Sequence, residues 1–193
     1  MAKPSYVGLL NSIAVNEAKG ERLLNTWAAH TQDAELKSAL KFVAVREGEH
    51  AWAFTKRLCE LGYDVDEARA FQVFKDFDGL LACAASDASD FDKVARLAGN
   101  DTDGTNADPF GGFFKDTSID PETGALLGRY IAEERDSGRR LRAAYQRIRD
   151  LGPGPDTSSA ETSAGGDLDA VKAHLTALRS EVKVLRKKLK KLG

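Results

Sequence analysis

Apolar residues recur at helical spacing along most of the chain, and no useful stretch alternates between apolar and polar positions as a half-buried strand would. The first apolar stripe predicts a long helix over about residues 5–30. The second predicts a helix that follows an N-cap at Asp33 and stops at the C-cap glycine Gly62. These two helices, joined by a short turn, are expected to be antiparallel neighbours.

Two more helices are expected further along the chain. The third covers about residues 77–97, after a segment at 63–76 that is long enough for a crossover. The composition of residues 99–120 is that of a loop. The fourth helix begins at Pro121 after the N-cap candidate Asp120 and carries apolar residues on one face to about residue 150. The chain is therefore predicted to be all-α.

The character of the sequence changes after the fourth helix. Residues 152–167 are rich in Gly, Pro, Ser and Thr, which is typical of a flexible linker. Residues 168–192 then place Leu or Val at alternating spacings of three and four, the pattern of a coiled coil. We expect three parts: a helical bundle over 1–151, the linker, and a coiled-coil helix over 168–193. The last should make the protein a homo-oligomer, and the alternative is that it docks on the bundle.

Composition narrows the class of protein. The 193 residues are 42% hydrophobic and 30% charged, as in a globular protein. No apolar run approaches the roughly 18 residues that a membrane span requires, and the N-terminus is a poor secretory signal. The two cysteines, Cys59 and Cys83, exclude a disulfide scaffold and a cysteine zinc site. A reducing, cytoplasmic location is the simplest expectation.

Charge is divided unequally along the chain. The net charge is −2, but residues 167–193 hold eight Lys and Arg against three Asp and Glu, a net +5 that leaves −7 for the rest. A basic helix of this kind could bind nucleic acid or an anionic membrane surface.

Acidic residues interrupt the apolar stripes of three predicted helices. Glu17 lies on the first stripe, Glu47 on the second and Glu134 on the fourth, and His50 continues the second stripe. Burying a carboxylate is costly unless it is paired or binds a metal. These four residues are therefore the candidate metal ligands.

The Glu47-x-x-His50 pair is the sharpest of these signals. Residues three apart on a helix point to one side, so a carboxylate and an imidazole can reach the same ion. Oxygen and imidazole donors without thiolate suit iron or manganese. The motif by itself arises easily by chance, but its place on a buried face, with Glu17 similarly placed, strengthens it.

The segments NEAKGERLLNTWAAH and LKFVAVREGEHAWAFTKRL resemble the first helix pair of the ferritin-like, rubrerythrin-type carboxylate bundles, and YIAEERDSGRRLRAAY resembles the helix with their second ExxH motif. The resemblance implies an up-down four-helix bundle with a crossover before its third helix. It also implies that Glu17, Glu47 and His50 are ligands, with Glu134 at the second glutamate position. In that family O₂ or peroxide reacts at carboxylate-bridged iron.

The sequence departs from the family pattern at two ligand positions. Ser137 stands where the second histidine would follow Glu134, and the neighbouring register, Glu133-x-x-Asp136, offers a carboxylate instead. Glu133 could also be the inward acid in place of its neighbour. The third helix should supply a glutamate, yet residues 77–98 contain none. A rubredoxin-like four-cysteine module is absent as well, so the expected site is a reduced one.

Two functions are consistent with these observations. The first is a metal-binding protein of peroxide, O₂ or iron metabolism, which uses the reduced carboxylate and histidine site. The alternative is a non-catalytic ferritin-like scaffold with a degenerate site, in which an arginine such as Arg46 or Arg139 pairs with the acids. Such a scaffold would act through its C-terminal tail. The sequence assigns no catalytic residue and leaves open whether the protein is an enzyme.

Overall fold

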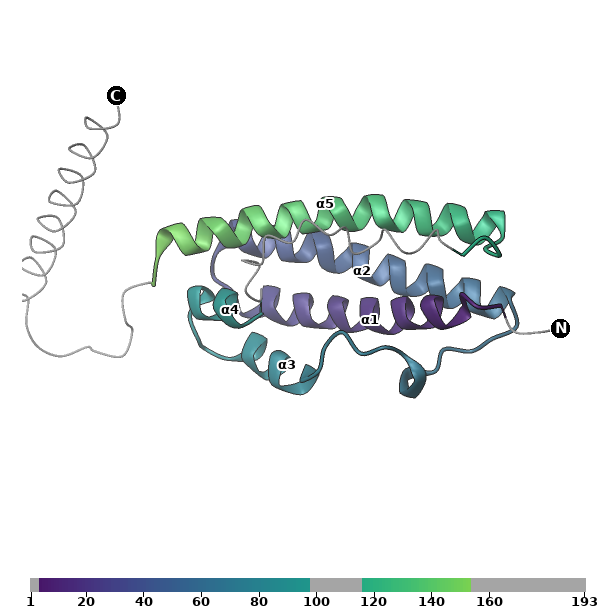
Figure 1. Cartoon of the computed structure of the whole chain (residues 1–193). Coiled ribbons are helices and arrows are strands. Elements are labelled where there is room, and N and C mark those ends of the chain that lie inside the picture. The colour runs from purple at the N-terminus through teal and green to yellow at the C-terminus, as the bar shows by residue number, and fades with distance from the viewer. Residues whose placement is uncertain (1–3, 98–115, 154–193) are drawn as a thin grey trace, which may run out of the picture. The chain divides into compact units, whose positions relative to one another are not determined.

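The computed structural model describes residues 4–97 and 116–153, whose regular structure is entirely helical (Figure 1). The elements are α1 (Val7–His30), α2 (Ala34–Glu60), the 3₁₀ turn η1 (Glu67–Arg69), α3 (Phe77–Ala85), α4 (Asp90–Leu97) and α5 (Pro121–Leu151). The all-α prediction is confirmed for this part of the chain. No helix in it is long and apolar enough to cross a membrane.

The expectations for the C-terminal region fall outside the described residues. They are the linker after residue 153, the coiled-coil helix over 168–192, the homo-oligomer it would form and the binding of an anionic partner by its basic residues. They stay predictions, and light scattering of a variant described in the Discussion tests the oligomer.

Side-chain caps set the ends of the long helices where the sequence predicts them. The Asp33 carboxylate accepts a hydrogen bond from the Leu36 amide at 2.7 Å and begins α2. The Asp120 carboxylate accepts one from the Thr123 amide at 2.9 Å and begins α5. Gly62 follows α2 with φ at +80°, a conformation that glycine adopts without strain.

The single third helix expected over residues 77–97 is divided into α3 and α4. The Ser86 hydroxyl donates to the Cys83 carbonyl oxygen at 2.7 Å, where α3 ends. The Ser89 hydroxyl accepts from the Asp92 amide at 3.1 Å, where α4 begins. Serine competes with the helical backbone for hydrogen bonds, so two serines three residues apart favour an end and a new start over a continuous helix.

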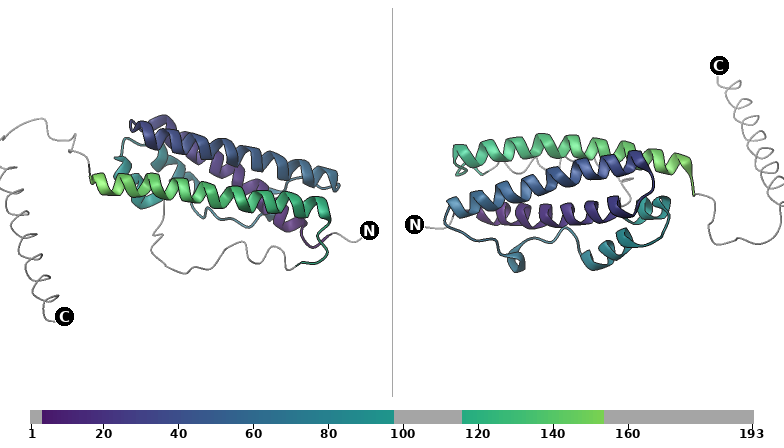
Figure 2. Two further views of the ribbon diagram at one scale, coloured as in Figure 1. Left: turned by 90° about the horizontal axis from the view of Figure 1, so that it is seen from above. Right: turned by 180° about the vertical axis from the view of Figure 1, so that it is seen from behind.

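The three long helices α1, α2 and α5 pack along one another (Figures 1 and 2). Helices α1 and α2 are antiparallel, joined by residues 31–33 as predicted. Helix α5 runs parallel to α1: the Tyr6 hydroxyl donates to Asp120 before the start of α5, and Trp27 stacks on Tyr145 near the other end of both helices. Helix α5 therefore begins at the end of the bundle where α2 finishes, and Arg57 of α2 contacts Asp120 there.

Residues 61–76 form the returning segment that leads from α2 to α3, and polar side chains of α1 hold its backbone. Asn11 donates to the carbonyl oxygen of Asp66 and accepts from its amide. Asn16 donates to the Phe71 carbonyl oxygen and accepts from the Val73 amide. Each asparagine satisfies a donor and an acceptor that an irregular backbone would otherwise leave to water.

The core has two apolar parts that lie at opposite ends of the bundle. One gathers residues around Trp27 and Leu40, and the other gathers residues around Leu10 and Phe54. On α1 and α2, the stretch between them carries the acids and the histidine that interrupt the apolar stripes. The structure therefore places this polar layer at mid-length, between two dry cores that fix its three helices.

A candidate metal centre

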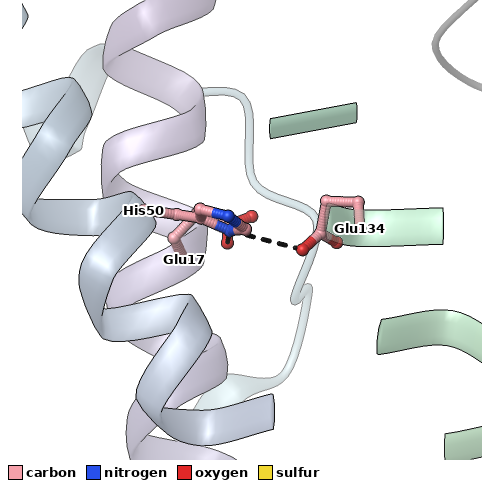
Figure 3. A group of neighbouring side chains, drawn as sticks. All are labelled: Glu17, His50 and Glu134. Carbon is pink, nitrogen blue, oxygen red and sulfur yellow. Dashed lines mark hydrogen bonds and ion pairs between the residues drawn. The ribbon is translucent and has the colours of Figure 1, made fainter. Parts of the chain in front are cut away.

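Three of the four predicted ligands meet at mid-length. Glu17 from α1, His50 from α2 and Glu134 from α5 each bring one donor atom into a group whose members lie within 4.8 Å of one another (Figure 3). Glu17 and His50 are each only 5% exposed. Each helix is anchored in both apolar cores, so the three side chains converge on a rigid support.

The spacing of the donor atoms suits a single metal ion. His50 Nδ1 lies 3.1 Å from Glu17 Oε2 and 3.4 Å from Glu134 Oε1. Two ligands that each lie about 2.1 Å from one ion are about 3.0 Å apart at right angles and about 3.4 Å apart at a tetrahedral angle. The Glu134 Oε1 atom is buried, and its contact with His50 is an ion pair without hydrogen-bond geometry. A metal would give this oxygen a direct bond.

Neighbouring side chains hold the outer atoms of two of the candidate ligands. His50 Nε2 lies 2.9 Å from the carboxylate of Glu133, and the Tyr130 hydroxyl donates to Glu17 Oε1 at 2.9 Å. When Nε2 of a neutral imidazole carries the proton, Nδ1 is left free to bind a metal. A carboxylate behind a histidine ligand is the usual way in which metal sites orient that ligand.

The fourth predicted ligand, Glu47, is not part of the convergent group. Its carboxyl lies against Gly20 of α1, where an added Cβ would overlap Glu47 Oε2. Glycine at this position therefore makes room for a carboxyl between two closely packed helices. Glu47 still shares a pocket with Glu17 and Glu134, so it borders the centre without joining it.

Burial and mutual repulsion perturb the acids of this layer. Burial, together with the charges of Glu17 and Glu134, raises the pKa of Glu47 to about 9. Burial also raises the pKa of Glu17, against the hydrogen bond from His50. Burial alone would lower the pKa of His50, but the carboxylates of Glu134, Glu17 and Glu133 outweigh it and raise the pKa to about 10. Four acids thus surround one imidazole: Glu47 keeps its proton at neutral pH, Glu133 is also paired with Arg129, and the carboxyl groups of Glu17 and Glu134 share His50.

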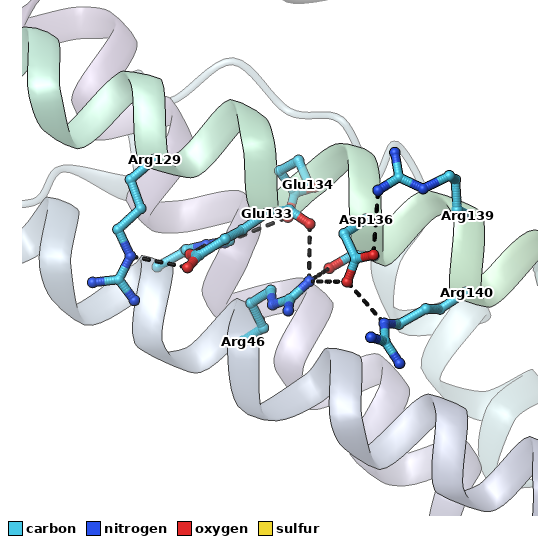
Figure 4. Close-up of polar contacts among 9 residues, drawn as sticks. Arg46, Arg129, Glu133, Glu134, Asp136, Arg139 and Arg140 are labelled. Atoms are coloured by element: carbon cyan, nitrogen blue, oxygen red, sulfur yellow. Dashed lines mark hydrogen bonds and ion pairs between the residues drawn. The ribbon is translucent and has the colours of Figure 1, made fainter.

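The arginine that sequence analysis considered as a partner for these acids lies beside the centre. Arg46 Nη1 donates to the backbone carbonyl of Glu133, to Asp136 at 3.0 Å and to the Ser137 hydroxyl at 3.2 Å (Figure 4). Arg140 and Arg46 lower the pKa of Asp136 to about 2. Ser137, at the place of the missing second histidine, therefore binds an arginine that is already paired with Asp136.

Two pockets reach this layer from different sides. One, of about 750 Å³, is lined by side chains of α1, α2, α5 and the returning segment, and includes Glu17, Glu47 and Glu134. The other, of about 520 Å³, lies between α2 and α5 and is lined by His50 and Glu133. Tyr130 lines both. The candidate ligands are thus buried in the bundle yet open to small molecules.

Sequence reasoning found the acids and the histidine but missed Tyr130. This tyrosine lies four residues before Glu134, so it falls on the same face of α5, and that spacing could have revealed it. Glu133 was named as an alternative to its neighbour, and the structure gives both acids a role beside His50. Asp90 of α4 accepts hydrogen bonds from Trp27 and Thr31, away from the candidate centre.

Comparison of the chain with protein-family models, with curated proteins and with solved structures finds no significant match. The case for the centre therefore depends on its own geometry.

Proposed function

We propose that the protein binds one transition-metal ion, iron or manganese, through Glu17, His50 and Glu134, and that it acts in peroxide, O₂ or iron metabolism. The observation that carries this proposal is the convergence of three donor atoms within 4.8 Å of one another, with His50 Nδ1 at 3.1 Å and 3.4 Å from the two carboxyl groups. The outer atoms of Glu17 and His50 are held by Tyr130 and Glu133. Carboxylate and imidazole donors suit these metals.

Charge supports the same proposal. Buried carboxylates require compensation, and the two acids of the proposed site, Glu17 and Glu134, share the single imidazole of His50. A divalent ion would compensate two negative charges and would bind Glu134 Oε1, which makes no hydrogen bond. The resemblance to rubrerythrin-type bundles, whose metal ligands include glutamate and histidine in these helices, is consistent with this assignment.

The protein's own residues would prepare the site. Tyr130 directs Glu17 by holding one of its oxygens, and Glu133 fixes the ring of His50. Protonated Glu47 could donate a proton to a molecule in the larger pocket, which it lines. A bound iron or manganese ion would supply Lewis acidity and one-electron chemistry toward oxygen species.

One observation favours the second candidate, a non-catalytic ferritin-like scaffold. His50, with its pKa raised to about 10, is an imidazolium at neutral pH in the metal-free protein and forms ion pairs with Glu17, Glu133 and Glu134. A proton can therefore take the place of a metal, and the fold would persist with an empty site. In that case the predicted coiled coil would carry the function.

Metal analysis distinguishes the two candidates. The full-length protein, expressed with iron and with manganese, should retain close to one metal ion per chain, measured by inductively coupled plasma mass spectrometry. His50→Ala and Glu134→Gln should both lose it. Glu49→Gln, which changes an exposed glutamate next to His50 on α2, should retain it.

Circular dichroism and thermal unfolding of each variant separate loss of the metal from loss of the fold. Negligible metal in the wild-type protein would reject metal binding and favour the scaffold. Equal metal in the wild type and in a folded Glu134→Gln protein would show that the ion binds elsewhere.

A further inference from the structure

The larger of the two pockets has apolar walls and an acidic end. Its walls include Ile13 of α1 and Phe71, Val73 and Phe74 of the returning segment. Phe71 is 74% exposed and Val73 60% exposed, so large apolar surface in this region is not covered by the described residues. A volume of about 750 Å³ is within the range of pockets that bind small organic molecules.

The pocket is formed in advance of any ligand. Asn16 and Ser12 of α1 hold the backbone at Phe71, through its carbonyl oxygen and its amide, and Asn16 also holds the Val73 amide. The opposite wall is α5, which is fixed by the core. A pocket whose backbone is already fixed loses little conformational entropy when a ligand binds. Its apolar contacts with the ligand therefore contribute more fully to the binding affinity.

The acidic end coincides with the proposed metal centre. Glu17 and Glu134 both line this pocket, whereas His50 lines the other one. A metal held by three protein ligands keeps coordination positions open for a further molecule. Two of those three ligands border the apolar pocket, so a molecule that fills it can place one end beside the ion.

We propose that this pocket binds an organic molecule with an apolar body and an oxyanion head, such as an alkyl carboxylate, with its head at the metal. The proposal rests on the proposed function, because without a metal the carboxylates of Glu17 and Glu134 would repel an anionic head. The apolar walls select the body of the molecule, and the metal selects the charge of its head.

Isothermal titration of the full-length protein with decanoate and with acetate, with and without Mn²⁺, tests both parts of the proposal. Each buried methylene strengthens binding about fourfold. Even partial burial of the chain should make decanoate bind the Mn²⁺-loaded protein at least about 100-fold more tightly than acetate. The metal-free protein should bind decanoate at least tenfold more weakly than the loaded protein.

A matched pair of glycine variants locates the binding site. Gly8 lines the pocket, and an added Cβ there meets nothing within 4 Å, so Gly8→Phe should fill the pocket without disturbing the helix. Gly128 on α5 has equally open surroundings, is exposed and lines neither pocket described above. Gly8→Phe should weaken decanoate binding at least tenfold and leave Mn²⁺ binding unchanged. Gly128→Phe should change neither, and Gly8→Leu should show a smaller form of the same loss.

The outcomes separate this proposal from the proposed function. If Mn²⁺ does not bind the wild-type protein, both are overturned. If Mn²⁺ binds but decanoate binds no more tightly than acetate, or equally well without metal, the metal centre stands and the ligand proposal is wrong. Normal decanoate binding by a folded Gly8→Phe protein would overturn the placement of the ligand in this pocket.

Discussion

Replacing Glu47 by glutamine should stabilise the metal-free protein at neutral and mildly alkaline pH. The pKa of Glu47 is raised to about 9, chiefly by burial. In the unfolded chain a glutamate ionises near pH 4.3. Between these two values the unfolded state loses a proton that the folded state keeps, so stability falls as pH rises through this window. Glutamine has the same shape and does not ionise, so the variant avoids this loss.

The magnitude follows from the shift. Each pKa unit is worth about 1.4 kcal/mol, and between two and three units separate pH 7 from the unfolded pKa. Because the acids of the layer interact, the other acids adjust when Glu47 ionises, and the gain is smaller than the product of these two numbers. We expect the variant to gain about 2–3 kcal/mol in the free energy of unfolding at pH 7. At pH 5 the gain should fall below about 1 kcal/mol, because less than one unit then separates the solution from the unfolded pKa.

Urea unfolding of chelator-treated protein at pH 5, 7 and 8.5 measures this effect. Glu49→Gln removes an exposed carboxyl two residues away and serves as the control, for which we expect a change of less than about 0.5 kcal/mol. A Glu47→Gln protein that is less stable than the wild type at pH 7, or a difference that does not grow between pH 5 and pH 8.5, would refute the reasoning.

Three other predictions concern separate parts of the molecule. Tyr130→Phe removes the hydroxyl that holds the α1 glutamate, so it should weaken metal binding 10–100-fold in calorimetric titration, an estimate from outer residues of other metal sites. Gly128→Ala should raise the free energy of unfolding in urea by about 0.5–1 kcal/mol, whereas Gly20→Ala should gain less or lose stability because the new Cβ displaces a buried carboxyl. If residues 168–192 form a coiled coil, Leu178→Glu should lower the mass per particle in light scattering to that of a single chain, and an unchanged mass would contradict it.

Much of the fold follows from local signals in the sequence. The caps at Asp33 and Asp120 and the glycine at 62 mark helix ends by short-range hydrogen bonding, and the structure confirms them. The break between α3 and α4 was missed because the apolar spacing continues across it. Two serines compete with the helical backbone there, at Ser86 and Ser89, and periodicity does not register that competition.

The candidate site was predictable as a set of residues but not as an arrangement. Acids on apolar stripes mark a layer, but the stripes do not show which of these side chains converge. Glu17, His50 and Glu134 do so, whereas the Glu47 carboxyl lies against Gly20 and borders the group. A contact across helices more than 80 residues apart, such as that of His50 with Glu133, leaves no local signal in a single sequence.

Anomalous X-ray diffraction from crystals of the full-length protein soaked in Mn²⁺ shows directly whether Glu17, His50 and Glu134 hold one ion. We expect one strong peak at a distance of about 2.0–2.3 Å from His50 Nδ1 and from a carboxylate oxygen of both Glu17 and Glu134. The Nε2 atom of the same ring should still contact Glu133. A well-diffracting soaked crystal with no peak at this place, or with a peak on the Nε2 side of the ring, would contradict the proposed site.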